Sequence, residues 1–393
     1  MADTITVKQL LSLIPDQQLS RLAENTGVDY QVKVLFGRSM FYLLLYGLAE
    51  SERTSLRSLE DVFNSRRFKL LFNLDSQQTT RYNSLSDRLA TMNLDFFEQS
   101  YRMIYDLFSR QFSSEESIKY NITRVDSTMV AETANKLEAG MVTGLKKDGK
   151  KQVKYTVSLD GLLPSSVEVF TGQAELSEDK TIPAAILKLA DTHKDNVFVF
   201  DRGVQNRGAY VDLHQKDLRF VTRLRANSRY RTIEKLPLPG NLQIGNLRII
   251  TDEWVYLYGS KNKRIDVPFR LIIAKNEQDK PLLFVTNMKL TADGELIAAE
   301  DIIAIYKSRW DIEVFFRFIK QELNFSHFLS TNINGIKIIL YMTLILAMLI
   351  HIYKKNNNVG YKTAKRRVKM ELDELITIII VQACGGDPNI VFR

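Results

Sequence analysis

The chain has 393 residues, of which 45% are hydrophobic and 25% charged, a composition typical of a soluble globular protein with room for two or three domains. Its single cysteine, Cys384, excludes a disulfide framework and a cysteine-based zinc site, and its four histidines lack the spacing of paired metal ligands. The net charge of +8 favours a polyanionic partner, and residues 121–275 hold most of the excess, with 25 Lys and Arg against 18 Asp and Glu.

Residues 1–115 are predicted to form a helical N-terminal domain, because apolar residues recur there at three- and four-residue intervals. Short helices joined by tight turns permit a helix-turn-helix that binds DNA. Its exposed polar residues would be Arg81, Asn83, Ser84 and Arg88. Any helical bundle produces the same pattern, and the segment is nearly neutral, so a purely structural role stays open beside DNA-end binding.

An α/β domain is predicted to follow. Its first three strands are NITRVDST, KQVKYTVSL and SSVEVFTG, and a helix follows over about residues 183–192. The run Val197–Phe200 is wholly apolar, which indicates a strand buried on both faces, and QNRGAYVDLHQ after it is predicted to be a helix. The order is therefore three strands, helix, strand, helix, strand.

Two aspartates end the first and fourth of these strands, Asp126 in VDST and Asp201 in FDRG. Carboxylates at neighbouring strand ends can come together and bind hard divalent cations. Each has a plainer alternative. Asp126 could be a cap or turn residue, Asp160 competes with it as a strand-end carboxylate, and Asp201 could be a turn aspartate.

Residues 219–231 are predicted to form one strand with a cationic face and a core face, because the residue types alternate with a period of two. The cationic face carries Arg219, Arg223, Arg225, Arg229 and Arg231. This face predicts contacts with DNA phosphates, from Arg223 and Arg225 above all, although a solvated strand explains it equally well. More strands are predicted up to about residue 290.

Residues 306–320, YKSRWDIEVFFRFIK, are predicted to form a single buried helix with one narrow charged stripe. The stripe holds Tyr306, Arg309, Glu313, Arg317 and Lys320. A lone carboxylate among cations suits a metal ion held beside phosphate oxygens. The alternative is an amphipathic helix with a solvated face, in which Glu313 is a surface residue.

The spacing Tyr306-x2-Arg309-x3-Glu313-x6-Lys320, after VDS and FDRG in the same chain, resembles the signature of the IS4-type family of bacterial DDE transposases. The resemblance covers roughly residues 120–353. It implies a ribonuclease H-like catalytic domain over residues 116–353, with a β-strand insertion at about 228–290. The predicted order of strands and helices agrees with that fold.

The resemblance also implies roles for individual residues. Asp126, Asp201 and Glu313 would bind two Mg²⁺ ions, with Mn²⁺ able to substitute, while Tyr306, Arg309 and Lys320 would contact phosphates near the transposon end. Three carboxylates suffice for such a site, because Mg²⁺ keeps several of its waters. By its place on the stripe, Arg317 is a further candidate for DNA contact.

The implied activity is metal-dependent cleavage at transposon ends followed by strand transfer into target DNA. The implied partner is double-stranded DNA, both terminal inverted repeats and target, bound by a homodimer in the synaptic complex. The expected location is the bacterial cytoplasm, at the nucleoid when DNA is bound. A DNA-binding regulator without chemistry and a metal-dependent nuclease without strand transfer remain alternatives. A hairpin step would need a base-stacking aromatic residue, and neither Trp254 nor Trp310 can be assigned to it.

The C-terminal part begins with a predicted core helix over residues 336–353. Its apolar run of 15 residues, 338–352, is shorter than the about 20 residues that a bilayer requires, so no membrane partner is expected. Residues 354–393 are predicted to be a basic tail that ends in a loose segment, VQACGGDPNIVFR. The basic residues of the tail are Lys362, Lys365, Arg366, Arg367 and Lys369.

Overall fold

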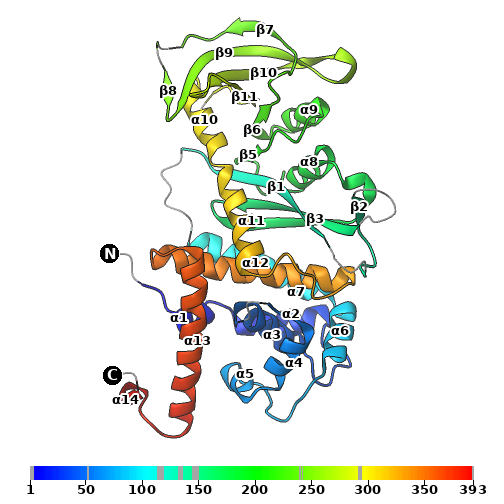
Figure 1. The fold of residues 1–393 in the computed structure, drawn as a ribbon, viewed down its shortest axis with the longest axis vertical. Helices are drawn as coiled ribbons and strands as arrows, with labels where there is room; N and C mark the ends of the chain where they lie inside the picture. Colours follow the sequence, from blue (N-terminus) through cyan, green and yellow to red (C-terminus); the bar gives the residue numbers. More distant parts are fainter. Residues whose placement is uncertain are drawn as a thin grey trace. The chain divides into compact units, whose positions relative to one another are not determined.

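The computed structural model describes residues 4–50, 53–112, 119–131, 136–143, 150–238, 240, 242–290 and 294–391. The chain divides into two compact units. Unit 1 comprises residues 1–113, 130–152 and 316–393, and unit 2 comprises residues 114–129 and 153–315. Unit 1 is mainly helical, whereas unit 2 holds most of a large sheet (Figure 1).

Helices occupy most of the described residues between 4 and 112. They are α1 (Val7–Ser12), α2 (Asp16–Thr26), α3 (Gly37–Glu50), α4 (Leu56–Asn64), α5 (Arg66–Leu71), α6 (Tyr82–Thr91) and α7 (Leu94–Gln111). The helical pattern of this segment is thus present in the structure. These helices share their compact unit with residues 130–152 and 316–393, so the units do not follow the predicted boundaries at 115 and 353.

The central helix of unit 1 is α12 (Ile333–Asn356), which packs against α3, α7 and α13 (Tyr361–Ala383). It is longer than predicted, and within the described residues it alone has the length and hydropathy to cross a membrane. Because 89% of its most apolar window is buried inside the protein, α12 is a core helix, as predicted.

The predicted basic tail is helical over most of its described length. Its basic stretch lies in the first half of α13, which buries Ala364, Val368, Leu372 and Ile376 at helical spacing. The prediction of a loose final segment is wrong in part, because α13 continues to Ala383 and a short helix, α14 (Pro388–Val391), follows.

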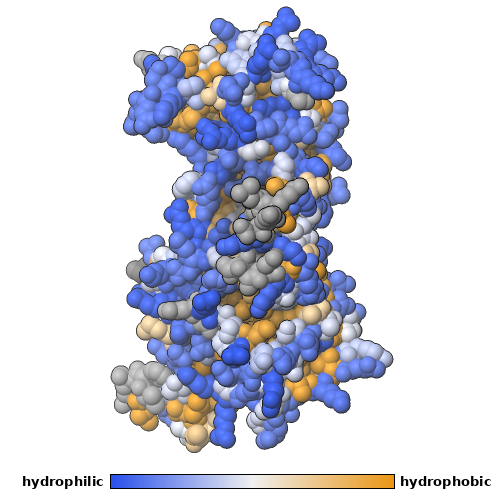
Figure 2. Space-filling model, turned by 45° about the vertical axis from the view of Figure 1, so that its right-hand side comes forward, coloured by the Kyte–Doolittle hydropathy of each residue, from blue (hydrophilic) through white to orange (hydrophobic). Residues whose placement is uncertain are grey.

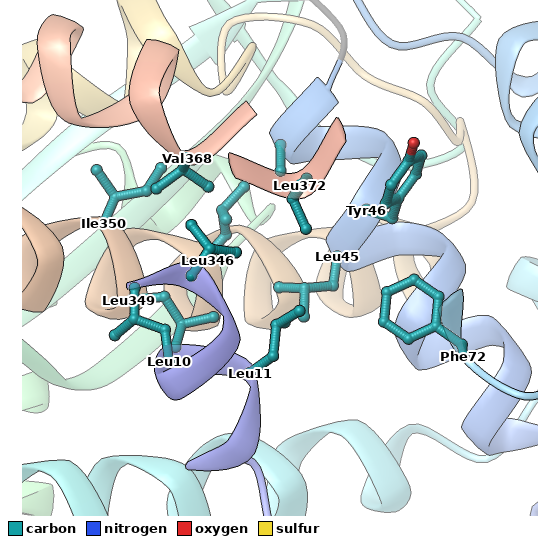
Figure 3. A pocket seen from close by; sticks show the side chains of 12 residues that line it. Leu10, Leu11, Leu45, Tyr46, Phe72, Leu346, Leu349, Ile350, Val368 and Leu372 are labelled. Carbon is teal, nitrogen blue, oxygen red and sulfur yellow. The ribbon is translucent and has the colours of Figure 1, made fainter. Parts of the chain in front are cut away.

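Helices α1, α3, α12 and α13 enclose an apolar cavity of about 30 Å³ in unit 1. Figure 3 shows Leu10, Leu45 and Leu349 among the side chains that converge on it. A hydrogen bond from Val7 N to the Glu371 carboxylate (2.7 Å) connects α1 to α13 beside the cavity. The same carboxylate accepts a hydrogen bond from the Tyr353 hydroxyl of α12. In the space-filling view, hydrophobic side chains gather over the helices of this unit (Figure 2).

The described strands form one 11-stranded sheet with the order β2-β3-β1-β5-β6-β11-β10-β9-β7, in which β4 also pairs with β3 and β8 with β9. The first five in sequence are β1 (Ile122–Ala131), β2 (Met141–Thr143), β3 (Lys150–Asp160), β4 (Leu163–Phe170) and β5 (Val197–Phe200). The others are β6 (Arg219–Leu224), β7 (Tyr230–Lys235), β8 (Gln243–Ile244), β9 (Leu247–Tyr258), β10 (Arg264–Lys275) and β11 (Pro281–Thr286). Strands β1, β5 and β6 are parallel neighbours, whereas β6, β11, β10, β9 and β7 follow one another antiparallel.

Helices cover both faces of the sheet in unit 2. On one face, α8 (Glu178–Lys188) and α9 (Arg207–Gln215) pack on a cluster that includes Phe198, Phe220 and Phe269. On the other face, α10 (Ala299–Lys307) packs on Val199 and Phe284. Burial on both faces explains why the four residues of β5 are all apolar.

Two predicted elements are wrong in their extent. The predicted strand 219–231 is two strands. A turn closed by a Ser228 N to Arg225 O hydrogen bond (3.0 Å) ends β6, and β7 pairs with β9, which places β7 four strands away from β6 in the sheet. The five arginines therefore do not share one strand face. Helix α8 begins at Glu178, five residues before the predicted start, because Ser177 caps it (Asp179 N to Ser177 Oγ, 3.2 Å) and Pro183 is tolerated inside it.

Candidate active site

The two aspartates of the predicted triad lie at the same edge of neighbouring strands. Strand β1 runs parallel to β5, with Val125 opposite Phe200, so Asp126 and Asp201 each follow the last residue of that pairing. Strand β1 continues beyond Asp126 to Ala131, which makes it longer than predicted. Thr222 of β6 donates from its hydroxyl to Phe200 O (2.8 Å) and so secures the end of β5.

The competing aspartate, Asp160, lies elsewhere. Its carboxylate accepts a hydrogen bond from the Thr123 hydroxyl (2.6 Å) and lies 2.5 Å from His193 Nε2. Thr123 lies three residues before Asp126 on β1, roughly 10 Å along the strand, so Asp160 lies away from Asp126. Asp160 is therefore not an alternative to Asp126 at this site.

The signature segment is not the single helix that its periodicity predicts. Helix α10 ends at Lys307, and α11 (Trp310–Glu322) begins after a two-residue break at Ser308 and Arg309 (Figure 1). At the break, Asp311 N and Ile312 N donate to the carbonyls three residues before them, at 3.1 and 3.2 Å. These are 3₁₀-type bonds, which tighten the turn and change the direction of the backbone.

The break nevertheless leaves the signature side chains beside the aspartates. Arg309 Nη1 lies 3.4 Å from Asp126 Oδ2, and its Nη2 donates to Glu313 Oε1. The Tyr306 hydroxyl donates to Asp201 Oδ1 (3.2 Å). Asp126 and Glu313 thus contact the same guanidinium, while Tyr306 ties the end of α10 to Asp201. The side chains of Asp126 and Arg309 are only 14% and 11% exposed.

The carboxylates of the site lie close to one another and are largely shielded from water. Burial raises the pKa of Asp126 to about 7, and the charges of Glu178 and Asp201 add to this, although the Ser127 amide and Arg309 oppose it. Burial lowers the pKa of Arg309, but its hydrogen bond to Glu313 and the nearby Asp201 and Asp126 raise that pKa overall. A positive charge therefore stays fixed among these acids.

A fourth carboxylate, Glu178, was not foreseen from the sequence. It lies in the first turn of α8, where burial raises its pKa, with Lys154 opposing and Asp201 reinforcing that shift. A Cβ built on Gly203 would lie 1.6 Å from Glu178 Oε2, so the turn after Asp201 needs glycine in order to accept this carboxylate. The signal was hidden because the helix was predicted to begin at Pro183.

The remaining predicted DNA contacts fall into two groups, one in unit 2 and one in unit 1. Arg223 of β6 lies beside the site, with its guanidinium 5.7 Å from the Tyr306 ring, and among the described residues no hydrogen-bond partner reaches its buried Nε. Arg225 is exposed in the turn that follows β6. Arg317 and Lys320 lie in α11 beyond Phe315 and belong to unit 1.

One of the polar residues predicted to face DNA in the helical segment also makes structural contacts. Arg88 donates to Val28 O (2.6 Å) and to Leu35 O (2.9 Å), which joins α6 to the segment before α3. Arg81, Asn83 and Ser84 are exposed at the start of α6, and Arg81 and Ser84 line an open groove of about 510 Å³.

The donor set suits a hard divalent cation. Asp126, Asp201, Glu313 and Glu178 supply only carboxylate oxygens, the ligands that Mg²⁺ prefers. The pKa of Asp126 is raised first by burial and then by the nearby Glu178 and Asp201, so a cation would stabilise its ionised form. Among the described residues, no group of three or more His, Cys, Asp or Glu is arranged to hold one ion together. The arrangement agrees better with ions that are each held by few carboxylates and complete their shells with water and phosphate oxygens.

Comparison with known proteins identifies the family. The model of the Transposase DDE domain matches residues 118–349, which include both aspartates and the whole signature. The chain belongs to the Transposase DDE domain family. The prediction of a DDE transposase of the insertion-sequence type, and therefore of an enzyme, is confirmed. Enzymes of this family act on DNA and use divalent metal ions.

Several transposases resemble the chain over much of its length. It is 25% identical over 330 residues to the transposase of insertion sequence element IS5377 from Geobacillus stearothermophilus, an alignment that covers 82% of this chain and 78% of that relative. It is 26% identical to the transposase of element IS4SA from Synechocystis, with 70% and 77% covered. It is also 26% identical over 162 residues to transposase y4zB of Sinorhizobium fredii, where the alignment covers 41% of this chain and 44% of y4zB.

One solved structure supports the fold. The piggyBac transposase in a synaptic complex with hairpin DNA matches 98% of this chain and 82% of its own, with a TM-score of 0.51 and 11% sequence identity. At this identity the likeness concerns the fold alone, a mixed α/β architecture with a large sheet and covering helices.

Proposed function

We propose that Asp126, Asp201 and Glu313 carry the DNA cleavage and strand transfer of this transposase. The observation that carries the proposal is the shared guanidinium of Arg309, which contacts Asp126 and Glu313 although 186 residues separate these two in the sequence. Tyr306 adds Asp201 to the same group through its hydroxyl. A ribonuclease H-like core is part of the proposal, supported by the neighbouring parallel strands β1, β5 and β6 and the antiparallel pair β3 and β4.

Two Mg²⁺ ions, or Mn²⁺ in their place, are the proposed cofactors. Asp126, Asp201 and Glu313 would hold them, with Glu178 as a further acidic neighbour. When bound, such ions activate a water or a 3′-hydroxyl as the nucleophile and stabilise the leaving oxygen of the phosphodiester. Asp126, which protonates with a pKa of about 7 without metal, gives up its proton when a cation binds.

Arg309 would change partners during this process. In the structure it neutralises Asp126 and Glu313, which would instead hold a divalent cation when one is bound. The guanidinium then pairs with a DNA phosphate, to which it can offer two parallel N–H donors. Arg223, Tyr306 and Lys320 are the proposed additional phosphate contacts, and Arg225 and Arg317 are further candidates.

The proposed reaction also assigns roles to the N-terminal helices, to the strands over about 228–290 and to a second copy of the chain. Residues 1–115 would bind the transposon end, with Arg81, Asn83 and Ser84 exposed at the start of α6. The strands over about 228–290 would be the family's insertion, here continuous with the central sheet through β11 and β6. A homodimer would join two element ends with target DNA, in the bacterial cytoplasm and at the nucleoid.

Cleavage of a labelled duplex tests the proposal. The substrate is a terminal inverted repeat of the element that encodes this chain, joined to flanking DNA, with a scrambled repeat as the control. The proposal expects cleavage at the element boundary with Mg²⁺ or Mn²⁺, none with Ca²⁺ or EDTA, and joined products when target DNA is added. Binding to ends without cleavage in either metal would favour a regulator, and cleavage without joined products would favour a nuclease.

A further inference from the structure

A buried arginine lies directly beside the proposed metal ligands. Arg124 is only 1% exposed and precedes Asp126 by two residues on β1. Because side chains alternate along a strand, both point to the face on which Ile122 packs with the α10 cluster. Phosphate contact does not explain a guanidinium buried so completely.

All three nitrogens of Arg124 have defined partners. Nε donates to Ser308 O (2.7 Å), Nη1 donates to Gly161 O (2.7 Å), and Nη2 lies 3.0 Å from Asp311 Oδ2. Ser308 and Asp311 flank the start of α11, whereas Gly161 belongs to the tight turn between β3 and β4, where its φ of 57° favours glycine. Arg124 thus joins the catalytic strand to the break in the signature segment.

The contact with Ser308 explains why the helix breaks there without glycine or proline. In a continuous α-helix the Ser308 carbonyl would accept from Ile312 N. Here Ile312 N donates to Arg309 O, and the Ser308 carbonyl accepts from Asp311 N and from Arg124. The guanidinium therefore satisfies a carbonyl that the tighter turn leaves with spare acceptor capacity.

We propose that Arg124 is a positioning residue for the metal-binding carboxylates, which it serves by fixing the break between α10 and α11. The break lets Tyr306 reach Asp201 while Arg309 reaches both Asp126 and Glu313. This inference rests on the proposed role of the three carboxylates. It adds a residue outside the signature that determines where the signature side chains lie.

Lysine cannot perform this task. A guanidinium presents five N–H donors in a rigid plane, which allows Arg124 to reach two carbonyls and one carboxylate at once, whereas a lysine ammonium is a single flexible point of charge. Arg124→Lys therefore keeps the charge but loses the three-way geometry. A displacement of about 1 Å at Glu313 is enough to lower the rate about 100-fold.

Arg270 of β10 provides a matched control. It is also 1% exposed, it pairs with a carboxylate, that of Asp252, and it donates to the carbonyl of Ile297 (2.7 Å). It contacts neither Ser308 nor Asp311. Arg270→Lys therefore reports the general cost of altering a buried arginine in the same sheet. Asp311→Asn, at a half-exposed position, weakens the Arg124 contact without changing the interior.

The experiment uses the full chain and two readouts. The first is the emission and acrylamide quenching of Trp310, which directly follows the break, measured in a Trp254→Phe background in which it is the single tryptophan. The second is the rate of end cleavage across a Mg²⁺ titration. Thermal unfolding identifies variants that fold.

We expect Arg124→Lys and Asp311→Asn to change Trp310 quenching and to slow cleavage about 10- to 100-fold relative to Arg270→Lys, with a higher half-saturating Mg²⁺ concentration. Unchanged Trp310 quenching together with cleavage within twofold of Arg270→Lys would overturn the inference. If Arg124→Lys does not fold, Asp311→Asn decides by the same criteria. If the unaltered protein does not cleave, the proposed function fails, and the Trp310 readout still tests whether Arg124 sets the break.

Discussion

Replacing Asp126 by Asn should stabilise the metal-free protein at alkaline pH and have little effect in acid. Burial holds the pKa of the folded carboxyl at about 7, against 3.8 for the unfolded chain. The folded protein therefore binds more protons than the unfolded protein between these values, so the free energy of unfolding falls as pH rises through this window. Asn carries no charge to desolvate and removes that dependence.

The size of the effect follows from the two pKa values of Asp126. One pKa unit corresponds to about 1.4 kcal/mol, so the raised pKa costs roughly 4 kcal/mol of stability at pH 8 and less than about 2 kcal/mol at pH 5, where the folded carboxyl is protonated. The variant should gain stability over the unaltered protein by about 2 to 3 kcal/mol more at pH 8 than at pH 5. Binding of a divalent cation should reverse the order, because Asn is a poorer ligand.

Urea denaturation in EDTA at several pH values measures this difference. Both tryptophans, Trp254 and Trp310, lie in unit 2 together with Asp126, so their fluorescence follows the unfolding of the relevant unit. Asp191→Asn, at an exposed site in the same unit, is the control. If Asp126→Asn and the control show the same pH dependence, the carboxylate is not held in a desolvated site and the electrostatic account is wrong.

Three further predictions concern other parts of the molecule. Asp252→Asn should destabilise unit 2 by about 3 to 5 kcal/mol in urea denaturation, because it leaves the buried Arg270 without its counter-charge; a loss below about 1 kcal/mol would contradict this. Glu178→Gln should lower the Mg²⁺-dependent cleavage rate by about 10-fold or more while end binding persists, and an unchanged rate would exclude Glu178 from the site. Arg223→Ala should reduce the slope of log affinity for DNA ends against log salt by about one unit, whereas a slope equal to that of the unaltered protein would mean that Arg223 contacts no phosphate.

The sequence predicted which side chains lie near one another better than it predicted the elements that carry them. Asp126 and Asp201 could be placed because each comes directly after a strand pattern, and the pairing of the parallel strands β1 and β5 ends just before both of them. The signature segment was predicted as one helix because nothing in YKSRWDIE interrupts a helix locally. The break at Ser308 depends on Arg124, 184 residues away, and such a contact leaves no periodic trace in the sequence.

Contacts that the sequence does not reveal also explain the other differences between the predicted and the observed elements. The arginines of residues 219–231 alternate as in a strand, but the turn at Arg225 depends on the pairing of β7 with β9, which places β7 four strands away from β6 in the sheet. Glu178 was overlooked because Pro183 looked like a helix start, whereas Ser177 caps the helix earlier. The sequence pattern predicted which faces of the elements are apolar or charged, whereas tertiary contacts determine where the elements begin and end.

The central claim is that Glu313 joins Asp126 and Asp201 in metal-dependent cleavage. The most direct test compares end cleavage and end binding by Glu313→Gln, with Glu322→Gln on the same helix as the control. Gln keeps size and helix propensity but removes the charge that a metal ligand needs. The account predicts that Glu313→Gln loses cleavage by several orders of magnitude with Mg²⁺ and still binds ends, while Glu322→Gln does both. Cleavage by Glu313→Gln at the rate of the control would show that the carboxylate set is misassigned.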